Sequence, residues 1–173
     1  MKLSQSRTIG VVIALLVFVA DQAIKWLVTG PLGLDLEGEH LRLLPIFDLQ
    51  FVQNVGVSLG LLKADSDMMR WLLVALTGLI ALGVAVWMTR EKKLGDLIAL
   101  GMVLGGALGN ILDRVRLGYV VDYADLHFGQ WRPFLVFNVA DAGITIGVLI
   151  LLIRALLVRE RTKTTPVENE QNA

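Results

Sequence analysis

Four long apolar stretches constrain this chain of 173 residues more than any other feature of its sequence. Trp71–Thr89, for example, holds nineteen residues without a charge. A helix of that length covers about 28 Å, close to the ~30 Å hydrocarbon core of a bilayer, and a backbone in lipid must satisfy its own hydrogen bonds. The sequence therefore predicts an all-α integral membrane protein with four transmembrane helices. The expected spans are about residues 8–29, 70–89, 95–113 and 135–155.

The first apolar stretch begins like a removable signal peptide, with Lys2 and Arg7 ahead of it. Cleavage after Ala20, however, would put Phe18 where a cleavage site needs a small residue, and apolar character resumes at Trp26. We therefore expect this span to be retained.

The length of the chain suggests one membrane-embedded domain, residues 1–160. Two loops, 30–69 and 114–134, connect its spans on one side of the membrane. The polar residues 161–173 have little to bury and are expected to form a flexible cytoplasmic tail.

The distribution of Lys and Arg orients the chain. The two termini and the loop 90–96 carry nine of them in 34 residues, whereas segments 29–70 and 113–137 carry six in 67. By the positive-inside rule both termini face the cytoplasm and the long loops face outward. The formal net charge of +0 leaves no global basic field for nucleic acid, so we expect no nucleic-acid partner.

The first outer loop has a pattern of its own. Phe47, Leu49 and Phe51 alternate with polar residues, which is typical of a half-buried strand. A second extended piece is expected at Tyr119–Tyr123, so a small extracytoplasmic β-sheet is predicted, with an irregular loop as the alternative. Ser66 is the expected N-cap of the second span.

Polar residues from separate segments should meet at one depth near the outer surface, because each lies at the outer end of its span or in the adjoining loop. Ionisable groups at such depth are costly and therefore suggest a functional site. The set comprises Asp21, Lys25, Asn110, Asp113, Arg114, Asp122, Asn138 and Asp141.

Structural roles for most of this set stay open. Asp21 and Lys25 are four residues apart on one helix, so an ion pair explains both. Asp113 and Arg114 can form a local ion pair at a helix end, and the two asparagines can join helices by hydrogen bonds.

Asp141 is harder to explain structurally, because its own span offers no cation until Arg154 at the opposite end. Its natural companion is Asp122. Two carboxylates in a partly dehydrated site share a proton, one acting as base and the other as acid, and can activate water for attack on an amide. The chain has no cysteine and two histidines, so we expect neither a metal nor another cofactor.

Small residues recur at helical spacing in the last two spans. Gly101, Gly105 and Gly109 lie four apart, as do Gly143 and Gly147. Such spacing lets helix backbones approach closely, and we expect it to bring the third and fourth spans together.

Several motifs together resemble the bacterial lipoprotein signal peptidase family, signal peptidase II, over about residues 9–157. They are Asp21-Gln-Ala-Ile-Lys25, Asn54-Val-Gly56, the block Gly105–Leu126, and Phe137-Asn-Val-Ala-Asp141. The long block is highly specific, whereas the first motif alone would be weak.

The resemblance implies an aspartic endopeptidase of the bacterial inner membrane. Its substrates are prolipoproteins whose cysteine carries a diacylglyceryl group, and it cuts just before that cysteine. Asp122 and Asp141 fall on the family's catalytic pair. The supporting positions fall on Asn54, Asn110, Asp113, Arg114, Asn138, Asp21 and Lys25. Lipid-modified substrates and membrane lipid are the expected partners, and we expect a monomer.

Two departures from the family pattern bear on substrate range and rate. Val57-Ser58-Leu59 replaces the usual Ala-Ala-Phe, and Ala142 replaces the usual Ser after the second aspartate. The first departure creates a G-x-S-x-G match with His127 downstream, which is a serine-hydrolase signature. That motif needs a strand–turn–helix on an α/β sheet, so a Ser58-based membrane hydrolase is only an alternative.

A non-enzymatic protein that uses its buried acids for ion or proton movement, or for partner binding, is the other alternative. Four spans without an internal repeat argue against a transporter.

Overall fold

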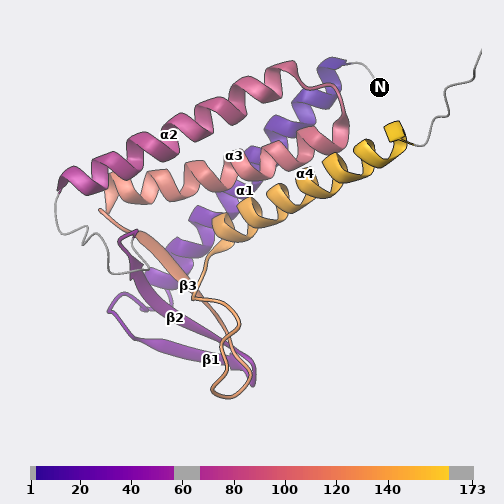
Figure 1. Ribbon diagram of the computed structural model, residues 1–173. Helices are drawn as coiled ribbons and strands as arrows, with labels where there is room; N and C mark the ends of the chain where they lie inside the picture. Colours follow the sequence, from indigo (N-terminus) through magenta and orange to yellow (C-terminus); the bar gives the residue numbers. More distant parts are fainter. Residues whose placement is uncertain (1–2, 57–66, 164–173) are drawn as a thin grey trace, which may run out of the picture.

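The computed structural model of this protein describes residues 3–56 and 67–163 (Figure 1). These residues form four helices and three strands. Their bounds are α1 Leu3–Thr29, β1 His40–Leu44, β2 Phe47–Asn54, α2 Asp67–Arg90, α3 Leu94–Arg116, β3 Val120–Leu126 and α4 Val139–Lys163. Each helix is long and apolar enough to cross a membrane. The predicted fold class, four apolar helices with a small sheet, is confirmed.

Some sequence-based expectations fall on residues that the structure does not describe. Ser66 as a helix cap, the segment Val57-Ser58-Leu59 and most of the predicted tail, from residue 164 onward, lie outside the described residues.

Helix α3 is the centre of the bundle, between α2 and α4 and in front of α1 (Figure 1). In its apolar window 50% of the residues are buried, compared with 22% in α1 and 11% in α2. The other helices therefore cover α3 and present apolar side chains outward, as expected for a protein surrounded by lipid.

Glycines allow this close packing, although one of the two predicted stripes meets a different helix from the one the sequence suggested. A Cβ atom at Gly101 would collide with the backbone of Gly10, and one at Gly105 with that of Ala14. The stripe on α3 that we expected against α4 therefore packs against α1. The expected approach of α3 and α4 is made by Gly147 of α4, where a Cβ atom would meet the carbonyl oxygen of Ala99, and by Gly106 of α3, where one would meet that of Ala140.

The sheet lies at one end of the bundle, with antiparallel strands in the order β1-β2-β3 (Figure 1). Phe51 of β2 and Val121 of β3 pack with Val28 of α1, so the sheet rests on the end of the first helix. β2 contains the first extended piece that the sequence predicted, and β3 overlaps the second, Tyr119–Tyr123, from Val120 onward. β1 was not predicted, because all five of its residues are exposed and show no alternation.

The start of α4 differs from the expected start at residue 135. Phe137 forms a β-bridge to Ala124, so the chain before α4 is extended and pairs with β3. Asn138 then caps the helix, since its side-chain oxygen accepts a hydrogen bond from the backbone N–H of Asp141 at 2.8 Å. This cap places Asp141 in the first turn of α4.

Candidate active site

The two aspartates that the sequence singles out meet where β3 passes the start of α4. Asp122 lies on β3, and Asp141 lies in the first turn of α4. Asn138 joins them: its side-chain amide donates to Asp122 at 2.6 Å, and its backbone N–H donates to Asp141 at 3.4 Å. One asparagine thus contacts both carboxyl groups.

Two further asparagines hold the remaining carboxyl oxygens. The Asn54 amide at the end of β2 donates to Asp122 Oδ2 at 2.9 Å, and the Asn110 amide on α3 donates to Asp141 Oδ1 at 2.8 Å. Asn54 reaches Asp122 because β2 and β3 pair with Val52 opposite Asp122, which puts Asn54 on the same face as a diagonal neighbour.

A tight turn after β2 fixes the position of Asn54. Its side-chain oxygen accepts a hydrogen bond from the Gly56 backbone N–H at 2.9 Å. Gly56 has φ 97°, a conformation that favours glycine, and a Cβ atom there would also press on Leu73 of α2. The turn therefore explains why the Asn-x-Gly motif has a glycine two residues after the asparagine.

Burial raises the pKa of Asp122 to about 6, and the charge of Asp141 contributes to the rise. The hydrogen bonds from Asn54 and Asn138 oppose it, because they stabilise the carboxylate. In the described part of the chain, no Lys or Arg nitrogen forms an ion pair with either aspartate. Asp122 is therefore a buried acid that can hold a proton near neutral pH.

Arg114, also expected at the site, lies within electrostatic range of both aspartates. Its buried Nε has no hydrogen-bond partner. The backbone oxygen of Arg114 accepts a hydrogen bond from Arg70 Nε at 2.7 Å, which ties α2 to the end of α3. The guanidinium thus adds positive charge beside the pair without neutralising either carboxylate by direct contact.

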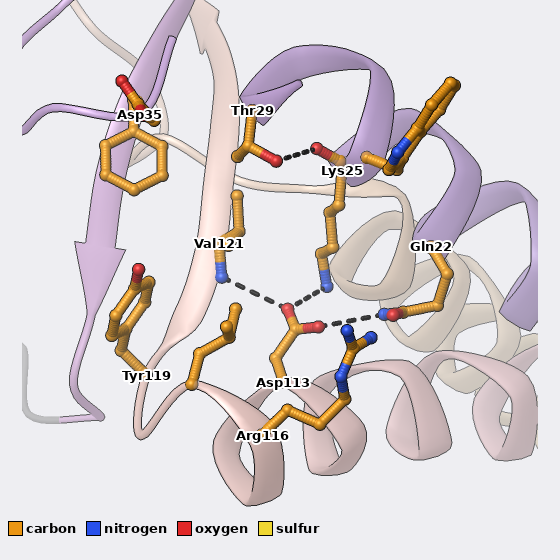
Figure 2. Close-up of a pocket in the computed structure, with 11 residues that line it drawn as sticks. Gln22, Lys25, Thr29, Asp35, Asp113, Arg116, Tyr119 and Val121 are labelled. Carbon is orange, nitrogen blue, oxygen red and sulfur yellow. Dashed lines mark hydrogen bonds and ion pairs between the residues drawn. The ribbon is translucent and has the colours of Figure 1, made fainter. Parts of the chain in front are cut away.

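A second polar cluster is linked to the pair through Asn110 and contains the remaining predicted residues. Lys25 Nζ lies 2.8 Å from Asp21 and 2.7 Å from Asp113, and donates to Asn110 at 3.3 Å. Figure 2 shows Lys25 and Gln22 both reaching Asp113. The local Asp113–Arg114 ion pair that the sequence allowed does not form, because Asp113 faces α1.

The second cluster supports the first through the backbone of α4. Asp21 accepts a hydrogen bond from the Ala140 N–H at 3.0 Å, one residue before Asp141. A carboxylate at this position satisfies a free N–H of the helix start and interacts favourably with its dipole. Asp21 therefore fixes the turn that carries Asp141.

Sequence reasoning missed Gln22 as a member of this site. Its amide donates to Asp21 at 3.1 Å and to Asp113 at 2.9 Å, so it joins the two carboxylates that Lys25 also contacts. The only available signal was its place between Asp21 and Lys25 in the first motif, since a single glutamine has no periodic pattern.

Next to Asp141 is an apolar cavity of about 240 Å³. Ala142, Thr145 and Ile146 of α4 line it, together with Phe134 and Phe137 of the preceding segment. An apolar group placed here would contact the first turn of α4, which carries Asp141. Because Ala142 lines this cavity, the departure from Ser noted in the sequence lies at the edge of the site.

The fold and the site together define a four-helix membrane protein with an amide-held pair of carboxyl groups at one end of the bundle. A family model described as signal peptidase (SPase) II matches residues 13–157. The chain belongs to the signal peptidase II family, as the motifs predicted, and is therefore a peptidase.

Known relatives agree with this assignment. A lipoprotein signal peptidase of Rhizorhabdus wittichii is 57% identical over 166 residues, 96% of this chain and 95% of the relative. One from Sphingopyxis alaskensis is 55% identical, over 88% and 87% of the two chains. A solved bacterial membrane enzyme superposes with a TM-score of 0.77 at 26% identity, covering 92% of this chain and 94% of the other.

Proposed function

We propose that this chain is an aspartic endopeptidase that removes the signal peptide from diacylglyceryl-modified prolipoproteins, cutting just before the lipidated cysteine. The relatives named lipoprotein signal peptidase support this substrate class. The observation that supports the mechanism is that Asn138 holds both carboxyl groups: its side-chain amide donates to Asp122 and its backbone N–H donates to Asp141.

In this mechanism the pair begins with one proton, held on Asp122, whose pKa is raised to about 6. Ionised Asp141 takes a proton from water, and the water oxygen attacks the carbonyl carbon of the peptide bond. Asp122 donates its proton to the carbonyl oxygen. The tetrahedral intermediate then collapses: its hydroxyl returns a proton to Asp122, the C–N bond breaks, and Asp141 protonates the leaving nitrogen.

The proposed arrangement in the cell follows from the charge distribution. The enzyme spans the bacterial inner membrane as a monomer with both termini in the cytoplasm, and the pair lies near the periplasmic face. A lipidated substrate then reaches the site sideways from the bilayer. The apolar cavity beside Asp141 is suited to an apolar part of such a substrate.

The test is cleavage of a diacylglyceryl-modified prolipoprotein by membranes containing the Asp122→Asn or the Asp141→Asn variant. Both variants should insert normally and lose cleavage. Asp125→Asn is the matched control on the same strand: Asp125 is also buried, but it pairs with Arg132. Full activity of either site variant would refute the proposal, and an inactive Ser58→Ala variant would point to the serine mechanism instead.

A further inference from the structure

The seam between α1 and α3 contains an apolar groove and a polar cavity, and neither is lined by Asp122 or Asp141. The groove, about 560 Å³ in volume, is lined only by apolar side chains. Val11, Leu15 and Phe18 of α1 form one wall, and Leu108 and Val115 of α3 belong to the other. Four of these five side chains are 40–60% exposed, so the groove is open along the helices.

The polar cavity continues the groove toward the sheet end of the bundle. It has a volume of about 360 Å³, and Gln22, Trp26 and Thr29 form its wall on α1. Figure 2 shows Gln22 and Thr29 on this wall. These residues follow Phe18 at intervals of three or four, so they lie on the same face of α1 as the groove. On α3 the groove ends at Val115, and the cavity is lined by the next residue, Arg116.

The charges around the cavity fall into a paired set and an unpaired set. Lys25 and Asp113 also line it, but they are paired with each other. Arg116 and Asp35 are both exposed, and neither side chain forms an ion pair or hydrogen bond within residues 3–56 and 67–163. The cavity therefore presents one free guanidinium and one free carboxylate.

The position of Trp26 indicates the depth of this cavity. It lies near the end of α1 and is 67% exposed. Tryptophan at the end of a membrane span is typical of the lipid–water interface. The polar cavity is thus at headgroup depth, and the apolar groove runs from it into the hydrocarbon region.

From this arrangement we propose that the α1–α3 seam binds a phospholipid whose headgroup carries a primary ammonium. The phosphate pairs with Arg116, the ammonium pairs with Asp35, and one acyl chain lies in the groove. An anionic headgroup without an ammonium would satisfy Arg116 but leave Asp35 unpaired next to added negative charge. The balanced lining therefore favours a zwitterionic lipid.

Val121 lines this cavity, and its neighbour Asp122 points to the opposite face of β3, so the site is separate from the aspartate pair.

The experiment is native mass spectrometry of the full chain, stripped of lipid in detergent and titrated with three lipids of matched acyl chains. They are phosphatidylethanolamine, phosphatidylcholine, which has no N–H to donate, and phosphatidylglycerol. We expect phosphatidylethanolamine to bind tightest. Arg116→Gln should weaken all three by about tenfold, since it removes a charged hydrogen bond to the shared phosphate.

The Asp35→Asn variant tests whether Asp35 is the residue that selects the ammonium headgroup. It should remove the preference for phosphatidylethanolamine while leaving phosphatidylglycerol binding unchanged or stronger. Arg42→Gln is the matched control, because Arg42 is exposed on β1 and does not line the cavity. Equal binding of the three lipids, or a preference that survives Asp35→Asn, would overturn the proposal. Tight binding of phosphatidylglycerol that is lost only in Arg116→Gln would overturn the choice of headgroup.

Discussion

Two groups of carboxylates lie at the same end of the bundle and differ in what neutralises them. Asp21 and Asp113 both contact Lys25, whose side chain is 5% exposed. Asp122 and Asp141 receive hydrogen bonds from three asparagines instead. Lys25 brings a positive charge into direct contact with the first group. The second group has no ion-paired Lys or Arg within the described residues, and burial raises the pKa of Asp122 to about 6 although the amide hydrogen bonds oppose the rise.

The difference predicts different losses when one carboxylate is neutralised in each group. Asp141→Asn should lower kcat by about a thousandfold or more, because it removes a group that transfers protons. Asp113→Asn should lower kcat less than about tenfold and act mainly on stability, because Lys25 keeps its contact with Asp21. Single-turnover cleavage together with thermal unfolding in detergent separates the two effects. Equal losses of kcat would mean that the distinction between the groups has no catalytic meaning.

Removing the shared cation should produce the next largest effect. Lys25→Met leaves two buried carboxylates without their partner, which typically costs about 3–5 kcal/mol of unfolding free energy. Denaturant unfolding in mixed micelles measures it. Lys25→Met combined with Asp113→Asn should recover part of the loss, since one uncompensated charge is then removed. A double variant less stable than Lys25→Met alone would contradict this account.

The free energy of unfolding should depend on pH, because the pKa of Asp122 differs between the folded and the unfolded chain. Its pKa is 3.8 in the unfolded chain and about 6 when folded, so the folded state binds the extra proton. The proton on Asp122 therefore adds to the free energy of unfolding in full below about pH 4, and this contribution is lost as pH rises through 6. Its upper limit is about 3 kcal/mol. Thermal melts from pH 4 to 7 should show this loss in the wild type relative to Asp122→Asn. A difference that stays constant over that range would exclude a raised pKa.

Sequence reasoning predicted the depth of the polar residues but not all of their partners. Four apolar spans fix which end of each helix a residue occupies, so the gathering of Asp21, Asp113 and Asp141 could be predicted from counting along the chain. The Lys25–Asp113 contact could not, because it depends on the glycine stripe of α3 packing against α1 rather than α4.

Other features depended on pairing that no local pattern encodes. β1 has no alternation and is exposed throughout, so only its pairing with β2 makes it a strand. The late start of α4 results from the bridge between Phe137 and Ala124, which overrides the apolar run. The contact of Asn54 with Asp122 likewise required the register of β2 and β3.

The smallest expected effect concerns Asn54, whose amide hydrogen bond lowers the pKa of Asp122. Asn54→Ala removes a donor that favours ionised Asp122, so the pKa of Asp122 should rise further above 6. Because the proposed reaction needs one proton on the pair, kcat/KM should fall on the alkaline side with an apparent pKa near 6 in the wild type. In Asn54→Ala this limb should move upward by about one pH unit. Gln53→Ala is the matched control, since Gln53 is exposed and adjacent. A limb that stays in place or moves downward would show that Asn54 supports the loop through Gly56 without tuning the acid.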